Sequence, residues 1–195
     1  MNNINFLLAG VGGQGTLLAS GVVAHVGAEA GFDVKKAEVH GMAQRGGSVS
    51  SQIRWGERIY SPLIAHGEVD YLVALEKLET LRYVDMLRPG GTVVIGDMRI
   101  PPLSVSSGAD VYPDDEQILK TVEQVAGKVC FVPSTRLAKE AGNVRAHNIV
   151  VLGALSSYLD DVASTIWQEV IAQWVPERYV QVNLQAFQMG QGARC

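Results

Sequence analysis

Cysteine is scarce in this chain of 195 residues, which has only Cys130 and Cys195. Iron–sulfur clusters are held by about four cysteine thiolates, often in closely spaced runs. The two cysteines stand far apart and form no such run, so this chain alone offers no cluster motif. The four histidines also lack a metal-ligand spacing such as HExxH. We therefore expect no metal site on this chain.

Charged residues are also few. They make up 18% of the chain, against about 25% in an ordinary globular protein. Apolar residues make up 47%, and this balance excludes intrinsic disorder. Two explanations remain open at this point: a large core in a chain rich in glycine and alanine, or a surface that a permanent partner covers.

Basic runs and long apolar runs are missing. The longest run of Lys and Arg is the pair Lys35-Lys36, and the net charge is -4, so the electrostatic footprint of a nucleic-acid-binding protein is absent. No apolar stretch approaches the roughly 20 residues of a membrane span. The segment Met1-Asn2-Asn3 lacks the basic region of a secretory signal. We expect a cytoplasmic protein with no nucleic-acid or membrane partner.

Strand and helix patterns alternate along the chain and predict an α/β fold. We expect one Rossmann-like domain over residues 1–195, with a mostly parallel but mixed sheet, an inserted β-hairpin and helices gathered at the C-terminal end. Strands are predicted at residues 4–9, 32–40, 48–55, 71–75, 92–96 and 128–132. Helices are predicted at residues 16–30, 76–87, 114–125, 134–141, 145–159 and 164–175, with a final turn at 184–190. The hairpin is placed at Gly56-Glu57, and Ser164 is expected to cap its helix.

The first predicted strand ends in a glycine-rich turn. Gly10, Gly12 and Gly15 fit the pattern GxGxxG between a strand and a helix. Such a turn gathers backbone N–H groups at a helix N-terminus, and these favour an anion such as phosphate. Glu38 lies where a dinucleotide fold places its ribose-binding carboxylate. A phosphate-bearing ligand, NAD included, is one interpretation, and a turn needed only for helix–sheet packing is the other.

A second glycine-rich segment, GMAQRGG at 41–47, follows the second predicted strand. Two glycine loops at the carboxyl ends of neighbouring strands would face each other across one crevice. With Arg45, Gln14 and Gln44 beside backbone donors, that crevice suits a long phosphorylated ligand or a loop of a partner protein.

Together these segments resemble a known family. GVGGQG at 10–15 and KKAEVHGMAQRGGSVSSQIRWG at 35–56 are similar to the gamma-type subunits of 2-oxoacid:ferredoxin oxidoreductases, and among these to the beta subunits of indolepyruvate enzymes. Further matching segments are YLVALE at 71–76, LRPGG at 87–91, and Asn148 with LGAL at 152–155. The likeness covers nearly the whole chain, and two paired glycine motifs are far more specific than a lone GxGxxG.

The resemblance implies an activity shared between subunits. A 2-oxoacid, here an aryl pyruvate such as indolepyruvate, is oxidatively decarboxylated, coenzyme A takes the acyl group, and ferredoxin takes the electrons. Gly96-Asp97-Met98 is only a near match to the GDG opening of a thiamine site. The resemblance therefore places thiamine diphosphate, magnesium and iron–sulfur clusters on a larger partner subunit in a heterotetramer. The choice of 2-oxoacid would also lie mostly with that partner.

The resemblance also implies binding residues for coenzyme A. Gly12, Gly13, Gln14 and Gly15, with Gly10 completing the turn, would cradle a phosphate or pantetheine segment. The opposing lip would consist of Met42, Gln44, Arg45 and Gly46, with Arg45 as the preferred phosphate partner because its planar fork matches phosphate oxygens. Glu76 and Asn148 complete the candidates, and no catalytic residue or metal ligand is assigned.

Each of these assignments has a structural alternative. Arg45 could form a surface or interface salt bridge, and the two glutamines could bond to the chain's own loops. Glu76 could be an acid that starts a helix, Asn148 a buried hydrogen-bonding residue, and His40 a structural residue rather than a proton relay. Two other functions also stay open: a stand-alone NAD- or nucleotide-binding enzyme, and an assembly module with no catalytic role.

Overall fold

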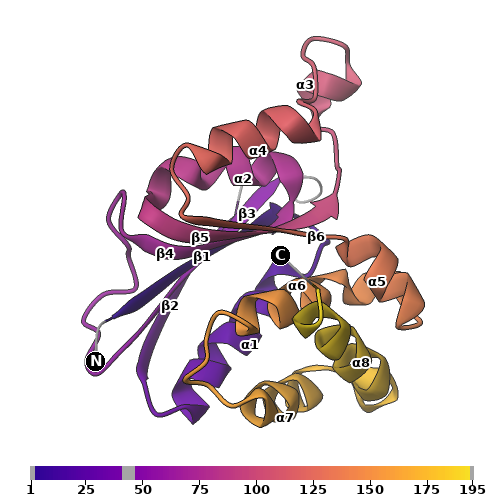
Figure 1. The fold of residues 1–195 in the computed structure, drawn as a ribbon. Helices are drawn as coiled ribbons and strands as arrows, with labels where there is room; N and C mark the ends of the chain where they lie inside the picture. The colour runs from indigo at the N-terminus through magenta and orange to yellow at the C-terminus, as the bar shows by residue number, and fades with distance from the viewer. Residues whose placement is uncertain (1–2, 41–46, 194–195) are drawn as a thin grey trace.

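The computed structural model of the protein describes residues 3–40 and 47–193. A six-stranded sheet with the order β2-β3-β1-β4-β5-β6 forms its centre. Helices cover both faces of the sheet, as Figure 1 shows. The strands are β1 (Ile4–Val11), β2 (Asp33–His40), β3 (Ser48–Gly56), β4 (Val69–Glu76), β5 (Leu87–Met98) and β6 (Lys128–Val132). The predicted single α/β domain is confirmed.

The sheet is mixed because β3 runs against its neighbours. The strands β1, β4, β5 and β6 pair in parallel, whereas β3 is antiparallel to both β1 and β2. The predicted hairpin turn at Gly56-Glu57 is wrong, since residues 57–60 form no strand. Besides β1, the antiparallel partner of β3 is the preceding strand β2, in a register that pairs His40 with Val49. As a result, β3 separates β2 from β1 and interrupts the plain βαβ opening.

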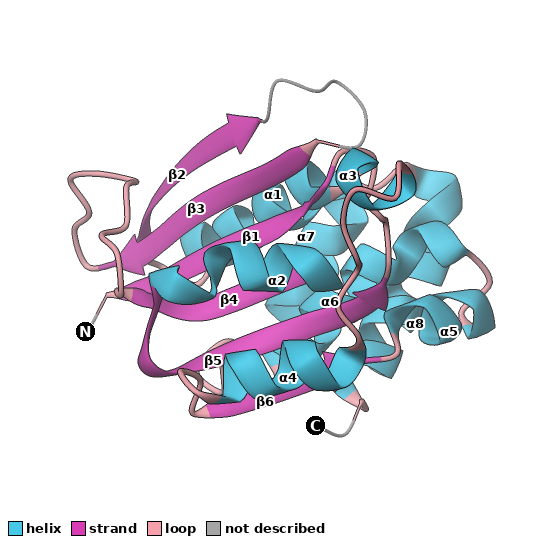
Figure 2. Ribbon diagram, turned by 90° about the horizontal axis from the view of Figure 1, so that it is seen from above, coloured by secondary structure: helices cyan, strands magenta, loops and turns pink. Residues whose placement is uncertain are grey.

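The helices divide unequally between the two faces of the sheet, as Figures 1 and 2 show. One face carries α1 (Thr16–Glu29), α5 (Ser134–Glu140), α6 (His147–Ser156), α7 (Ser164–Trp174) and α8 (Val180–Gln191). The other carries α2 (Lys77–Tyr83) and α4 (Asp115–Glu123), and the short α3 (Leu103–Ser106) projects beyond that layer. The 3-10 turns are η1 (Val84–Met86), η2 (Val144–Ala146) and η3 (Glu177–Tyr179).

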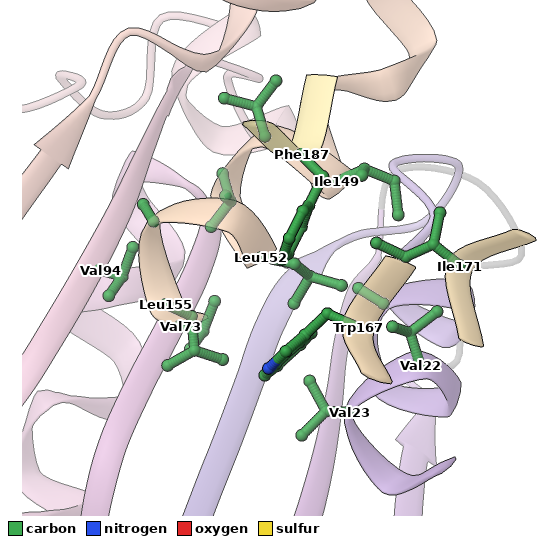
Figure 3. Close-up of a cluster of buried hydrophobic side chains, with 14 of the residues drawn as sticks. Val22, Val23, Val73, Val94, Ile149, Leu152, Leu155, Trp167, Ile171 and Phe187 are labelled. Carbon is green, nitrogen blue, oxygen red and sulfur yellow. The ribbon is translucent and has the colours of Figure 1, made fainter. Parts of the chain in front are cut away.

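The larger core cluster lies between the sheet and the C-terminal helices. All ten residues of α6 are buried, as expected for a helix that is apolar on every side. In Figure 3, side chains from α1, α6, α7 and α8 gather against Val73 and Val94 of the sheet. Trp167 and Phe187 stack there with ring centroids 5.9 Å apart. The apolar run predicted at 145–159 is thus the central helix of this layer.

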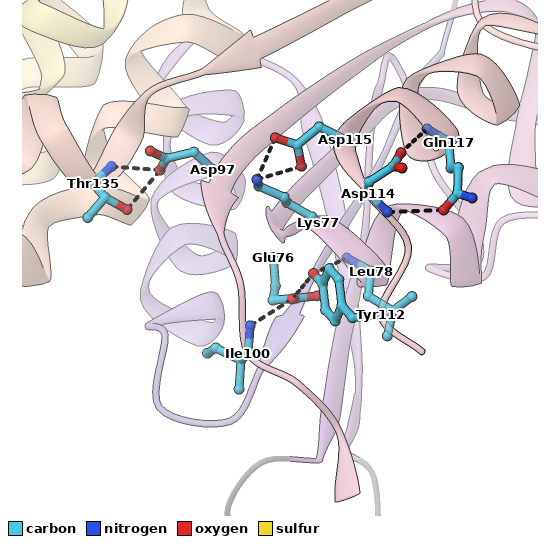
Figure 4. Close-up of polar contacts among 10 residues, drawn as sticks. All are labelled: Glu76, Lys77, Leu78, Asp97, Ile100, Tyr112, Asp114, Asp115, Gln117 and Thr135. Carbon is cyan, nitrogen blue, oxygen red and sulfur yellow. Dashed lines mark hydrogen bonds and ion pairs between the residues drawn. The ribbon is translucent and has the colours of Figure 1, made fainter. Parts of the chain in front are cut away.

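Two expectations about helix ends need correction. The turn predicted at 184–190 is part of α8, a helix of 12 residues. Ser164 is the first residue of α7 and not its cap, since Ala163 occupies the N-cap position. The Ser164 hydroxyl donates to Gln191 Oε1 at 3.2 Å instead. The helix predicted at 114–125 begins with a capping box, in which Asp114 and Gln117 bond reciprocally to each other's backbone N–H (Figure 4).

Helices α6 and α8 approach so closely that only glycine fits at their contact. A Cβ atom at Gly190 would lie 2.0 Å from the carbonyl oxygen of Val150, and one at Gly153 would lie 2.2 Å from that of Phe187. Both obstacles are backbone atoms, so a side chain at either glycine would force the two helices apart.

We expect Gly190→Ala to lower the free energy of unfolding by about 2–3 kcal/mol, the scale of an overpacked core. Gly192→Ala is the matched control, since its Cβ would meet nothing closer than 3.7 Å. Alanine near a helix end is ordinarily neutral or slightly stabilising. Urea denaturation of both variants measures the difference, and equal stabilities would refute the close approach of α6 and α8.

Candidate functional site

The glycine-rich turn lies between the carboxyl end of β1 and the start of α1. Gly13 and Gly15 have φ angles of 100° and 78°, in the left-handed region that favours glycine. Gly15 is the N-cap of α1, and no side-chain hydrogen bond caps that helix within the described chain. The first turn of α1 therefore presents backbone N–H groups, a favourable environment for an anion.

Gln14 fastens this turn to the sheet. Its Oε1 accepts a hydrogen bond from Val11 N at 2.7 Å, and its Nε2 donates to Leu75 O at 3.2 Å. The side chain is only 5% exposed. The side chain of Gln14 thus bonds to the chain's own backbone, at Val11 of β1 and Leu75 of β4, in keeping with its structural alternative. Gly10 leaves no room for a side chain, because a Cβ there would lie 2.6 Å from Thr16 Oγ1.

Asn148 connects the turn to α6, far along the sequence. Its Nδ2 donates to the carbonyl oxygen of Gly15 at 3.2 Å, and its Oδ1 accepts from Ile149 N at 2.9 Å. A Cβ at Gly15 would lie 2.4 Å from the same Nδ2. The structure therefore brings together two segments that the sequence pattern singled out separately.

Glu76 lies outside this contact and is the N-cap of α2. Figure 4 shows its carboxylate with Ile100 and Tyr112. Its Oε2 accepts from Glu79 N at 3.1 Å, and its Oε1 accepts from Ile100 N at 2.9 Å and from the Tyr112 hydroxyl at 2.5 Å. Burial and this carboxylate together raise the pKa of Tyr112. Both carboxylate oxygens of Glu76 are occupied by the chain itself, which matches its structural alternative as an acid that starts a helix.

Asp97, from the near match to a thiamine motif, also has a structural role. Its Oδ1 accepts three hydrogen bonds of 2.8 Å, from Ser134 Oγ, Thr135 N and Thr135 Oγ1. These contacts join the end of β5 to the start of α5 (Figure 4). Asp97 Oδ1 thus stabilises the start of α5.

The second glycine-rich segment reaches the first at one described residue. Met42, Gln44, Arg45 and Gly46 lie outside the described residues, but Gly47 O accepts a hydrogen bond from Gly12 N at 2.9 Å. The next residue, Ser48, donates to the carboxylate of Glu79. Burial raises the pKa of Glu79, although Ser48 and Arg82 act in the opposite direction. The end of the second segment is thus held between the turn and α2.

A cavity of about 510 Å³ opens beside the turn. Three parts of the chain line it: residues 12–15 with Leu18 of α1, residues 143–148 before and within α6, and side chains from the end of β5 and the C-terminal helices. The last group consists of Met98, Ile100, Val175, Pro176, Tyr179 and Asn183. Of the predicted site residues, Gly12, Gly13, Gln14, Gly15 and Asn148 line this cavity.

The cavity also includes Arg145 and His147, which sequence reasoning missed. Arg145 is exposed and forms no ion pair within the described chain. His147 is 5% exposed, and its Nδ1 has no hydrogen-bond partner among the described residues. Burial lowers the pKa of His147 to about 4, against an opposing effect of Asp97, so the ring is neutral near pH 7. The one available signal was the polar string NVRAHN directly ahead of an apolar helix.

The arrangement expected of an NAD enzyme is not formed around Glu38. That arrangement places the second strand directly beside the first, whereas β3 lies between them here. Glu38 instead forms an ion pair of 2.6 Å with Lys36. The described residues contain no group of three or more side chains that could hold a metal ion, and none of their helices is long and apolar enough to cross a membrane.

Fold and cavity together define an α/β domain with an anion-favouring turn, and comparison with known proteins names its family. Residues 5–193 match the model of the pyruvate ferredoxin/flavodoxin oxidoreductase family, so the chain belongs to that family. It is 38% identical over 192 residues to the indolepyruvate oxidoreductase subunit IorB of Thermococcus kodakarensis, covering 97% of this chain and 95% of the relative. The resemblance drawn from the two glycine motifs is confirmed.

Two solved structures share the fold. The gamma subunit of a keto/oxoacid ferredoxin oxidoreductase from Geobacter sulfurreducens is 23% identical, with a TM-score of 0.71 and 97% of each chain covered. The 2-oxoglutarate:ferredoxin oxidoreductase from Magnetococcus marinus, solved with 2-oxoglutarate, coenzyme A and succinyl-CoA bound, is 24% identical, with a TM-score of 0.73. The match covers 99% of this chain but 31% of that longer one. The fold of this chain thus occurs both as a separate subunit and within a longer chain.

Proposed function

We propose that this chain is the small, non-thiamine subunit of a 2-oxoacid:ferredoxin oxidoreductase that acts on an aryl pyruvate such as indolepyruvate. The complex would decarboxylate the 2-oxoacid oxidatively, pass the acyl group to coenzyme A and the electrons to ferredoxin. The observation that carries this proposal is the identity of 38% with a curated indolepyruvate oxidoreductase subunit along nearly the full length of both chains.

The larger subunit would hold thiamine diphosphate, magnesium and the iron–sulfur clusters. In support, the chain has only two cysteines, too few for one four-cysteine cluster. Several large apolar side chains are also exposed. Among them are Leu103 at 84% and Val111 at 86%, both on the connection from β5 to α4 that carries α3 (Figure 1). We propose that the partner subunit covers this part of the surface. We propose a cytoplasmic heterotetramer with two copies of each subunit, in keeping with the prevalence of two-fold symmetry.

Coenzyme A would bind at the cavity beside the turn. The turn at Gly12–Gly15 with the N-terminus of α1 favours its phosphates, and the apolar lining suits its extended arm. The related fold in an enzyme solved with coenzyme A bound supports the same ligand. Met42, Gln44, Arg45 and Gly46 remain the proposed opposing lip, because Gly47 brings the end of their segment to Gly12.

Gentle affinity purification of the tagged chain from its native host tests the complex. We expect a brown eluate that contains a larger subunit, thiamine diphosphate and iron, and that reduces a viologen dye with indolepyruvate and coenzyme A. A colourless chain that elutes without a stoichiometric partner would contradict the proposal. Retention of NAD by that chain would favour the stand-alone enzyme instead.

A further inference from the structure

The cavity beside the turn has a second polar wall, which the glycine motifs do not include. The first wall is the turn at Gly12–Gly15 with the uncapped start of α1. The second is formed by residues 143–148, where η2 leads into α6. Asn148 joins the two walls through its hydrogen bond to Gly15 O, so their separation is fixed by the fold.

Arg145 supplies a positive charge to the second wall. Its side chain is exposed, and the described chain provides it with no carboxylate partner. Its neighbours illustrate the contrast, since Arg136 of α5 pairs with Glu140 at 2.8 Å. An exposed guanidinium at the edge of a cavity, with no anion of the described chain as its partner, suits a phosphate-bearing ligand.

His147 is a second and independent indication of a ligand. The residue is only 5% exposed and lines the cavity. Its Nδ1 has no hydrogen-bond partner in the described chain. A buried polar atom without a partner costs about 1–3 kcal/mol. Such atoms are rare in native proteins and call for an explanation. Because Nδ1 is itself inaccessible, a ligand in the cavity would bond to this nitrogen only after the ring turns.

The remaining side chains that line the cavity indicate the chemistry of the rest of the ligand. Leu18, Ile100, Val175, Pro176 and Tyr179 give the cavity a mainly apolar surface. A ligand that satisfies all three parts has a phosphate group next to a flat or extended apolar portion. A free inorganic anion would leave this apolar lining without a contact.

We propose that Arg145 and His147 are ligand-binding residues of the coenzyme A site, with Arg145 paired to the diphosphate that the start of α1 also faces and His147 hydrogen-bonded to the ligand. This inference rests on the proposed function, because it takes coenzyme A as the ligand. It goes beyond the glycine motifs by assigning recognition to a wall formed by the C-terminal half of the chain.

Steady-state kinetics of the reconstituted complex tests the assignment of Arg145. We expect Arg145→Gln to raise the KM for coenzyme A about tenfold, the loss of one charge-assisted contact, with the KM for the 2-oxoacid unchanged. Arg136→Gln, which removes a charge from an exposed helix outside the cavity, is the matched control and should leave both values unchanged. ADP serves as the probe for the diphosphate, and its inhibition should weaken by the same factor in Arg145→Gln.

The outcomes separate this inference from the proposed function. An active complex in which Arg145→Gln changes neither the KM for coenzyme A nor inhibition by ADP would overturn the inference and leave the subunit assignment intact. A raised KM with unaltered inhibition by ADP would overturn the pairing with the diphosphate. Failure of the wild-type chain to form an active complex would instead contradict the proposed function.

His147 is tested by rescue in the same assay. We expect His147→Leu to raise the KM for coenzyme A several-fold while kcat changes little. His147→Gln keeps a hydrogen-bonding group at this position and should restore most of the affinity. Equal values for the two variants and the wild type would show that the ring makes no contact with the ligand.

Discussion

Replacing Gly15 with alanine should lower the free energy of unfolding by about 3 kcal/mol. Two effects add at this residue. Its φ angle of 78° lies in the left-handed region, which costs a residue with a side chain about 1–2 kcal/mol. The new Cβ would also lie 2.4 Å from Asn148 Nδ2, and overpacking of a buried contact costs about 1–3 kcal/mol. Denaturant unfolding of the isolated chain measures the sum.

Two further variants separate these effects. Gly13→Ala meets the backbone cost alone, because its φ is 100° but no heavy atom lies within 4 Å of its Cβ. The double variant Gly15→Ala/Asn148→Ala removes the clash, so its destabilisation should fall short of the sum of the single changes by at least about 1 kcal/mol. Strict additivity, or equal effects of alanine at the two glycines, would show that Asn148 does not restrict Gly15.

The second large effect is a loss of stability in mild acid that depends on His147. Burial lowers its pKa from 6.5 to about 4 in the folded protein. Between these two values the unfolded chain binds a proton that the native chain excludes, so the free energy of unfolding falls as the pH falls. One pKa unit corresponds to about 1.4 kcal/mol, which gives a total contribution of about 3 kcal/mol from this residue. Above about pH 7 the contribution of His147 no longer changes with pH.

A comparison of the wild type with His147→Leu isolates this contribution, because the effects of other titrating groups cancel in the difference. Glu79, whose pKa is raised by burial, is one such group and acts with the opposite sign. Near pH 7 we expect the variant to be as stable as the wild type or slightly more so, since it removes the unpartnered Nδ1. Its advantage should grow towards about pH 4.5, and parallel stability curves would contradict the buried neutral ring.

The strands were the part of the fold most open to prediction from sequence. Short runs rich in β-branched and aromatic residues, such as residues 71–75 and 128–132, favour strands, and both lie in strands of the structure. The position of β3 was not open to such reasoning, because strand pairing depends on contacts between distant segments. The pair Gly56-Glu57 carries a local turn signal, yet both neighbours of β3 in the sheet, β1 and β2, precede it in the chain.

The candidate site likewise combines residues that a sequence motif predicts with residues that only the folded structure reveals. The glycine turn and Asn148 follow from motifs, and the structure joins them through one hydrogen bond. Arg145 and His147 carry no motif, and only the packing of α6 beside the start of α1 makes them part of the cavity. Glu76 illustrates the reverse case, since a carboxylate at the end of a central strand suggests a ligand site but here caps a helix. The opposing lip at Met42, Gln44, Arg45 and Gly46 stays a prediction.

The most direct test of the account is an add-back experiment with the larger subunit of the complex. The subunit purified without this chain is assayed for dye reduction with indolepyruvate and coenzyme A, before and after the chain is supplied in increasing amounts. We expect activity to be absent at first and to rise until the two chains are equimolar, and the same titration with Arg145→Gln to require more coenzyme A. Full activity of the larger subunit alone, or no activity at any ratio, would contradict the assignment of this chain as a required subunit.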